Sequence, residues 1–255
     1  MDDNAIHLHV KQWYAWAPGV EDVDQWRRWA DGSLMFAIDA VPALPFIKPM
    51  LRRRLSQLSK MAVKAAFECL NKESNDFIAD RTVFCSRHGE LTRTVGLLEA
   101  LASGDELSPT GFSLSVHNAA SGLYSIARGD TAPSVSIAAG RDTLIEGVRE
   151  AAMLLAESGI NTVLVVVADE PLPSYLLQYA DEKQGPFALA ILLSKADVGK
   201  GCSFTALYDQ QQDVDSKEPQ SLEFIRFMLS GSNSVVMSGA RCDWQWQQNV
   251  EMQNV

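Results

Sequence analysis

Residues 162–167 read TVLVVV, and ADE follows at 168–170. A continuous apolar run without alternation is typical of a central strand that is covered on both faces of its sheet. Residues 187–193 (FALAILL) form a second run of this kind. The sequence therefore predicts a sheet whose middle strands are buried on both sides.

Helix and strand patterns alternate in the residues before this run. Residues 142–157 place apolar side chains at helical spacing, with Asp142 or Thr143 as the N-cap and Gly159 just after the helix. Ser134–Ala138 contains β-branched residues and is predicted to be a strand. The alternation indicates an α/β fold with a mostly parallel sheet covered by helices.

Further elements are expected on both sides of this core. Strands are predicted at 7–14, 81–85 and 234–237, and helices at 24–30, 50–70, 91–101, 113–127 and 220–229. Residues 41–49 contain three prolines and are predicted to be a loop, as is the polar stretch 209–220. We find no internal repeat and no linker composition, so we expect one domain over residues 1–255.

The composition excludes several classes of protein. The 255 residues are 47% hydrophobic and 21% charged, so a large core can form and a disordered or fibrous chain is excluded. The formal net charge of −10 disfavours nucleic acid and anionic membranes as partners. No apolar run is long enough to span a membrane, and the acidic N-terminus lacks the apolar stretch of a signal peptide. We therefore expect a cytoplasmic protein.

Motifs for metals, nucleotides and hydrolytic nucleophiles are missing. No two of the four cysteines form a C-x-x-C pair, so neither a zinc site nor a disulfide framework is expected. Residues 163–170 have the outline of a Walker B strand, but the phosphate-binding and dinucleotide-binding glycine motifs are absent. Residues 111–115 lack the last glycine of G-x-S-x-G, and His88 and His117 are interpreted as structural. No metal and no cofactor are expected.

One short segment is densely basic. Its cations between residues 48 and 64 are Lys48, Arg52, Arg53, Arg54, Lys60 and Lys64. Two interpretations stay open at this point. The segment is either a solvated helix face, with long side-chain stems lying along the surface, or a docking surface for an acidic partner.

Several motifs, in their order and spacing, resemble the β-ketoacyl synthase-like N-terminal family. These proteins are half-length relatives of ketosynthases found beside aryl-polyene and type II fatty-acid-like gene sets. The most specific motif is SPTGFSLSVHNAASGLYSI at 108–126. The others are WAPG at 16–19 with Trp26 and Trp29, RRRLS at 52–56, PSVSIAAG at 133–140, Asp142-Thr143, and VADE at 167–170 with Pro173. The resemblance covers residues 7–195, so the C-terminal part from about 200 to 255 is expected to be divergent.

The resemblance implies the thiolase-like fold, of which this chain would be a single N-terminal-half-type domain. In full ketosynthases a nucleophilic cysteine begins the helix after the strand that matches Ser134–Ala138. That position falls at or beside Arg141, and no cysteine lies within reach of it in the sequence. The second half, which carries the catalytic histidines, has no counterpart here. Because condensation needs both groups, the resemblance implies no catalytic residue in this chain and no activity alone.

Two hypotheses about function follow from the resemblance. The first is a non-catalytic subunit, similar to a chain length factor. It would form a heterodimer with a catalytic β-ketoacyl-acyl carrier protein synthase of polyketide or fatty-acid (aryl polyene) biosynthesis, and shape its acyl pocket. The alternative is a stand-alone synthase or acyltransferase with an unrecognised nucleophile, for which Ser121 and Cys85 are the candidates.

The resemblance also assigns residues to the surfaces of such a subunit. In this fold the strand before the active-site helix pairs with its copy across a two-fold axis, and nearby side chains reach the neighbour's acyl pocket. The acyl-pocket and interface residues would be Phe112, Leu114, Val116, Ser134, Val135, Ser136, Ile137 and Ala138. Acyl carrier proteins are strongly acidic, and ketosynthases meet them with basic residues. The carrier-protein docking residues would be Arg52, Arg53, Arg54 and Lys60.

Overall fold

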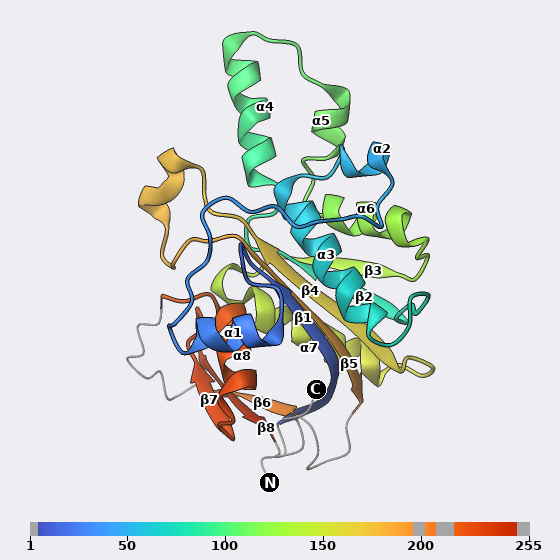
Figure 1. Ribbon diagram of the computed structural model, residues 1–255, viewed down its shortest axis with the longest axis vertical. Coiled ribbons are helices and arrows are strands. Elements are labelled where there is room, and N and C mark those ends of the chain that lie inside the picture. The colour runs from blue at the N-terminus through green and yellow to red at the C-terminus, as the bar shows by residue number, and fades with distance from the viewer. Residues whose placement is uncertain (1–4, 196–201, 208–216, 249–255) are drawn as a thin grey trace.

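The computed structural model describes residues 5–195, 202–207 and 217–248, and their strands form one sheet (Figure 1). The strand order is β3-β2-β4-β5-β1-β6-β8-β7. The strands are β1 (Ile6–Trp16), β2 (Arg81–Cys85), β3 (Ser134–Ile137), β4 (Thr162–Asp169), β5 (Phe187–Lys195), β6 (Cys202–Leu207), β7 (Ser234–Met237) and β8 (Asp243–Gln248). The two apolar runs at 162–167 and 187–193 are therefore neighbouring inner strands, as expected.

The sheet is parallel at one end only. β2 pairs in parallel with β3 and β4, whereas β5 pairs antiparallel with β4 and β1, and the pairs β1-β6, β6-β8 and β8-β7 are also antiparallel. The expected α/β fold is confirmed, but the expectation of a mostly parallel sheet is corrected. Burial on both faces produces an apolar run in a strand of either direction. Between β4 and β5 the chain forms only the 3₁₀-helix η2 (Ser174–Tyr179), whereas a parallel neighbour would need a crossover over the sheet.

Helices cover both faces of the sheet. They are α1 (Val23–Ala30), α2 (Pro49–Arg52), α3 (Gln57–Asn71), α4 (Leu91–Ser103), α5 (Pro109–Ser113), α6 (Ala119–Arg128), α7 (Thr143–Ala156) and α8 (Gln220–Ser230), with a 3₁₀ turn η1 (Gly140–Asp142) before α7. α3 and α6 pack on one face, and α7 packs on the other together with α8 and α1. The sheet is thus enclosed between two helical layers.

Strand β4 shows how the pleat supplies both cores. Val163, Val165 and Val167 belong to the cluster on the α7 side. Leu164, Val166 and Ala168 belong to the cluster on the α3 side. Alternate side chains of a strand point to opposite faces, so a strand between two helical layers must be apolar throughout. The TVLVVV run is apolar at every position for this reason.

Two predicted helices are each divided in the structure. The expected helix at 50–70 is α2 and α3, because Ser56 forms an N-cap whose hydroxyl accepts a hydrogen bond from Ser59 N at 2.9 Å. The expected helix at 113–127 is α5 and α6, and Ser115 Oγ donates to Phe112 O at 2.9 Å in the break. Serine side chains that bond to nearby backbone offer the chain an alternative to a continuous helix.

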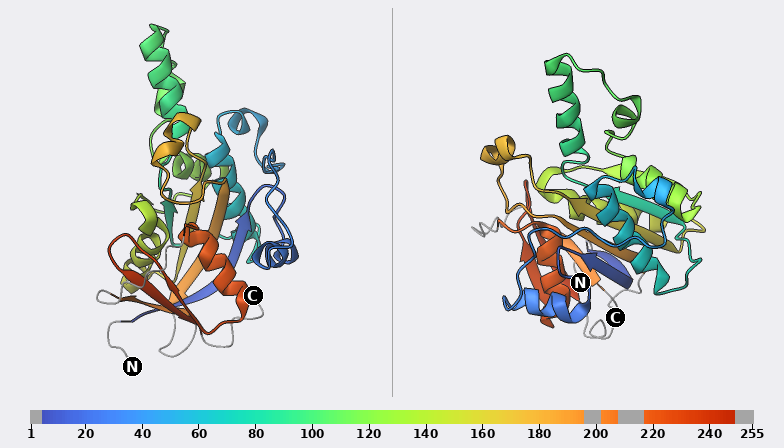
Figure 2. Two further views of the ribbon diagram at one scale, coloured as in Figure 1. Left: turned by 90° about the vertical axis from the view of Figure 1, so that its left-hand side faces the viewer. Right: turned by 45° about the horizontal axis from the view of Figure 1, so that its top comes forward.

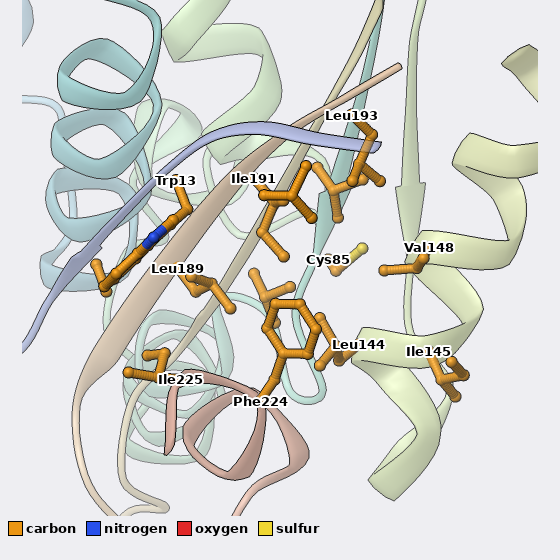
Figure 3. Packing of buried hydrophobic residues seen from close by; sticks show 14 of the residues in the cluster. Trp13, Cys85, Leu144, Ile145, Val148, Leu189, Ile191, Leu193, Phe224 and Ile225 are labelled. Atoms are coloured by element: carbon orange, nitrogen blue, oxygen red, sulfur yellow. The ribbon is translucent and has the colours of Figure 1, made fainter. Parts of the chain in front are cut away.

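The C-terminal residues contribute to the core on the α7 side. Phe224 and Ile225 of α8 belong to the same cluster as Leu144 of α7 and Leu189 of β5 (Figure 3). Strand β8, which the sequence pattern did not predict, adds the buried Trp246 to this cluster. β7 lies at the outer edge of the sheet as expected. The predicted loop at 209–220 falls mostly outside the described residues, except for 217–220.

One part of the chain projects from the body. α4 and α5 rise away from the sheet in all views (Figures 1 and 2). Neither helix contains a buried residue. α4 ends as the sequence indicates, with Gly104 in the left-handed conformation at φ 76°.

Candidate functional site

The parallel strands bring three connecting segments to one edge of the sheet. β2, β3 and β4 run in the same direction, so their carboxyl ends meet there. The segments that follow them are the corner at 86–90, the turn at 138–142 and the stretch 170–186. The carboxyl ends of parallel strands are where α/β proteins usually build their sites.

Arg141 lies at the start of α7, in the turn after β3. The side chain is half-buried. A hydrogen bond from Arg87 holds the pKa of Asp181 below its usual value, and the positive charge of Arg141 adds a smaller effect in the same direction. Cys69, Cys85 and Cys242 are buried. The residue just before the first turn of α7 is therefore an arginine, and the structure places none of these three thiols at that turn.

Asp142 does not form the predicted side-chain N-cap. Its buried carboxylate instead accepts hydrogen bonds from Ala240 N at 3.1 Å and from Gln220 Nε2 at 3.2 Å. Thr143 Oγ1 donates to Gly140 O at 2.7 Å and accepts from Ala139 N at 3.1 Å. The first turn of α7 is thus joined to the C-terminal part of the chain by contacts across about a hundred residues.

Cys85, one of the two alternative nucleophiles, is enclosed at the end of β2. Its sulfur lies against Gly147 of α7 so closely that a Cβ at that glycine would collide with it. Burial raises the pKa of the Cys85 thiol well above its usual value, and the nearby Asp169 carboxylate acts in the same direction. A protonated and enclosed thiol is not a nucleophile.

Ser121, the other alternative, lies on a polar groove beside β3. The groove has a volume of about 650 Å³ and is lined by His117, Asn118, Ser121, Gly122, Ser125, Ser134, Ser136 and Ala138. Ser121 Oγ donates to Ser134 Oγ at 2.9 Å, and His117 Nε2 lies 2.8 Å from Ser86 O. The histidine is therefore engaged with backbone rather than with the serine, and this geometry does not activate Ser121.

Asp169, at the end of β4, organises the corner after β2. Its Oδ1 atom accepts hydrogen bonds from Ser86 Oγ and Arg87 N, both at 2.8 Å, and from His88 N at 3.4 Å. Burial raises the pKa of Asp169 to about 7, although these donors act in the opposite direction. Gly89 completes the corner with φ 58°, and a Cβ there would lie 2.8 Å from the His117 ring.

Two further carboxylates hold the N-terminus of α3. Glu90 Oε1 accepts hydrogen bonds from Ser56 Oγ and Ser59 Oγ, both at 2.7 Å. Glu170 accepts from Leu58 N and from Thr92 Oγ1, the latter at 3.1 Å. Acidic side chains at a helix N-terminus are favoured by the unpaired N–H groups and the helix dipole. The Asp-Glu pair that resembles a Walker B end is therefore structural.

A cavity of about 720 Å³ opens beside Glu90 and Glu170. Its walls include the exposed Ile38 and Val41 and the prolines at 18, 171, 173 and 186. Arg93 also lines it and pairs with Glu90 at 3.4 Å. Both glutamates contact the starts of α3 and α4. The cavity therefore lies where the projecting helix α4 leaves the body of the protein.

The predicted interface residues fall into two groups. Among the described strands β3 pairs only with β2, so Ser134 to Ala138 lie at the edge of the sheet. Phe112 is 65% exposed and Val116 is 48% exposed, so neither is a core residue. Leu114, in contrast, is buried in the cluster on the α3 side. The structure therefore presents an open strand edge and two exposed apolar side chains.

The predicted docking arginines are at the surface. Arg52, the last residue of α2, and Arg53 and Arg54 after it are exposed, and Lys60 is half-buried on α3. Lys64 does not extend this group, because it is buried and pairs with Glu68 at 2.9 Å and Glu21 at 3.7 Å. The exposed basic cluster is thus shorter than the basic segment of the sequence.

The hydrogen-bonding roles of Glu90 and Asp169 were not predicted from the sequence. The acidic pair after a buried strand was noticed, but its partners lie on segments about 80 to 110 residues away. Within the described ranges, no group of three or more histidine, cysteine or acidic side chains is placed to hold a metal ion. Among the same residues, no helix is long and apolar enough to cross a membrane.

Comparison with known families and structures agrees with this geometry. The sequence model of the family described as beta-ketoacyl synthase, N-terminal domain, matches residues 26–247. The match therefore continues well beyond residue 195, where the recognisable motifs fade. No protein with a curated description matches the chain significantly.

Solved structures share the fold. One is a chain of the ketosynthase (ApeO) in complex with its chain length factor (ApeC) from Xenorhabdus doucetiae, with a TM-score of 0.80 and 31% identity over 94% of this chain and 99% of that chain. A chain of the AntDE:AntF complex, a type II polyketide synthase carrier protein with its ketosynthase, has a TM-score of 0.68 at 12% identity and covers 98% of this chain and 100% of that chain. The ishigamide ketosynthase/chain length factor has a TM-score of 0.63 at 14% identity and covers 82% and 69%. The fold is thiolase-like.

Proposed function

Because this chain belongs to the family of β-ketoacyl synthase N-terminal domains, we propose that it is a non-catalytic, chain-length-factor-like subunit of a β-ketoacyl-acyl carrier protein synthase. The observation that carries the proposal is Arg141 at the start of α7. The resemblance to full ketosynthases assigns this position to their nucleophilic cysteine. A guanidinium group cannot form the thioester that holds the acyl chain during condensation. The chain therefore needs a catalytic partner.

The similar half-length structure supports such a partnership. Its chain is 31% identical to this one and is covered over 99% of its length, and its description names both a ketosynthase and a chain length factor. A partner that carries the cysteine and the histidines would supply the chemistry that this chain lacks. The biosynthetic setting we propose is type II polyketide or fatty-acid synthesis, with aryl polyenes as the product class.

The proposed interface with the catalytic ketosynthase is the open edge of β3. Ser134 and Val135 are exposed, and the backbone of this edge has no strand partner among the described residues. An exposed edge strand is a template for pairing with another chain. Antiparallel pairing of β3 with the matching strand of a related subunit would continue the sheet across a pseudo-two-fold axis and bury Ser136 and Ile137 further.

The proposed pocket-shaping residue is Phe112, with Val116 beside the same segment. Phe112 is exposed on the projecting α5 and does not pack in the hydrophobic core of this chain. Leu114 is buried beneath this segment and supports it. An aromatic ring that enters the partner's acyl channel would limit the length of the chain that the channel accepts.

The proposed carrier-protein surface is the basic cluster of Arg52, Arg53 and Arg54, with Lys60 at its border. These residues are at the surface of a protein whose net charge is −10, so they form a local positive patch. A positive patch steers an acidic partner and increases its rate of association.

The test is co-expression with the ketosynthase encoded beside this chain. Light scattering after gel filtration should report a 1:1 complex, and the complex but not this chain alone should form ketoacyl product from acyl- and malonyl-carrier proteins. Val135→Glu on the β3 edge should disrupt the complex. Val236→Glu on β7, at the opposite edge of the sheet, is the matched control and should leave it intact. Ketoacyl product from this chain alone would refute the proposal.

A further inference from the structure

The projecting element, residues 91–116, has a surface that the body of the protein does not use. We call it the α4–α5 arm. Neither of its helices has a buried residue, and its largest apolar side chains are exposed by 59% at Leu98, 61% at Leu101, 39% at Leu107 and 65% at Phe112. Soluble monomers rarely gather large apolar side chains on one exposed projection, so such a surface indicates a binding partner.

Beyond Arg93, at its root, the arm carries charges of one sign only. No lysine or arginine occurs between Arg93 and Arg128. Glu99, Asp105 and Glu106 lie in this interval, and all three are exposed. The outer part of the arm therefore combines apolar side chains with acidic ones and has no cation to offset them. Its complement is an apolar surface bordered by basic residues.

The arm is held firmly at its root. Glu90, just before α4, accepts from the hydroxyls of Ser56, the N-cap of α3, and Ser59 of α3, and Thr92 in the first turn of α4 donates to Glu170. Within the arm, Gly111 of α5 approaches Leu97 of α4 closely enough that a Cβ there would lie 3.5 Å from the leucine. A rooted projection of this kind is pre-organised and loses little conformational entropy when it binds.

We propose that the α4–α5 arm docks on an apolar surface bordered by lysine or arginine residues on the catalytic ketosynthase, and that it does not contact the acyl carrier protein. The proposal rests on the function proposed above and deepens it by separating the two partners by charge. The acidic carrier protein is attracted to Arg52, Arg53 and Arg54 and repelled by the arm. The ketosynthase meets the arm with the opposite charge.

The experiment measures binding of this chain to the ketosynthase encoded beside it, and separately to the acyl carrier protein. Leu98→Asp combined with Leu101→Asp should weaken ketosynthase binding by about 100-fold or more, because truncation of one central apolar contact commonly costs tenfold or more. The circular dichroism and the melting temperature should stay those of the wild type, since neither leucine is buried.

A charge-reversed variant tests the second half of the proposal. Glu99→Lys, Asp105→Lys and Glu106→Lys together should weaken ketosynthase binding by about tenfold at low salt and reduce its salt dependence. Asp76→Lys, an equally exposed acid away from the arm, is the matched control and should change neither. None of these variants should weaken carrier-protein binding.

The outcomes separate the two proposals. If the wild-type chain does not bind the ketosynthase, both the proposed function and the docking role of the arm are refuted. If the wild type binds and both arm variants bind equally well, the docking role of the arm is overturned while the heterodimer stands. If the lysine variant changes only carrier-protein binding, the arm faces the carrier protein and the inference is also overturned.

Discussion

Replacing Asp169 with asparagine should stabilise the protein at neutral and alkaline pH and remove part of its pH dependence. The Oδ1 atom of Asp169 accepts three hydrogen bonds from the corner, from Ser86 Oγ, Arg87 N and His88 N. Asparagine keeps a carbonyl oxygen that can occupy this position. What it removes is the negative charge, which burial disfavours, with a smaller contribution from the nearby Glu182 carboxylate.

The magnitude follows from the pKa of Asp169, which rises from 3.8 to about 7. A raised pKa means that the folded protein keeps a proton that the unfolded chain releases between about pH 4 and pH 7. The stabilisation is full below pH 4 and is lost as the pH rises through 7. About three pKa units correspond to an upper limit of about 4 kcal/mol. Because the residue is partly exposed, we expect about 1 to 3 kcal/mol.

The assay is urea denaturation of wild type and Asp169→Asn at pH 5, 6, 7 and 8. The stability of the variant relative to the wild type should rise by about 1 to 3 kcal/mol between pH 5 and pH 8. A difference that stays constant over this range would refute the assignment of the raised pKa to Asp169. Comparison of the two proteins at each pH cancels the contribution of groups that do not interact with Asp169, such as Glu170, whose pKa is also raised by burial.

Asp80 supplies a control, because its pKa is shifted in the opposite direction to that of Asp169. Its Oδ2 atom accepts hydrogen bonds from Asn161 N, Thr162 N and Thr162 Oγ1, and these bonds outweigh burial and lower its pKa. A lowered pKa stabilises the folded protein above the unfolded pKa, and the effect is lost only at more acidic pH. Asp80→Asn should therefore destabilise the protein by a constant amount from pH 5 to pH 8.

Three further predictions concern the proposed function. Arg141→Cys should not give condensing activity to the isolated chain, because the catalytic histidines are still missing; ketoacyl product in a carrier-protein assay would contradict this. Arg53→Glu with Arg54→Glu should weaken carrier-protein binding by about tenfold and flatten its salt dependence, measured by calorimetry at two ionic strengths, whereas unchanged binding would make the cluster a solvated surface. Phe112→Ala in the heterodimer should lengthen or broaden the product distribution in mass spectrometry without abolishing turnover, and an unchanged profile would exclude a role of Phe112 in the pocket.

The elements and their burial could be read from the sequence. The runs at 162–167 and 187–193 predicted inner strands, and the structure splits the side chains of β4 between two cores. Gly104 and Gly129 end helices where the pattern indicates. These features depend on residues within a few positions of one another, so a local pattern is enough to specify them. The position of Arg141 after β3 likewise followed from the spacing of a contiguous motif.

The tertiary structure alone decided how these elements meet. The antiparallel direction of β5, the partnership of Ser86 with Asp169 83 residues away, and the bond between Leu58 and Glu170 112 residues away depend on topology. The sequence pattern of a carboxylate at a strand end is the same whether that carboxylate binds a cofactor or a helix N-terminus. Its role is set by the hydrogen-bond donors that the fold brings to it. The exposure of Phe112 was equally undetermined, since an aromatic side chain on a helix is core or interface according to what the rest of the chain leaves uncovered.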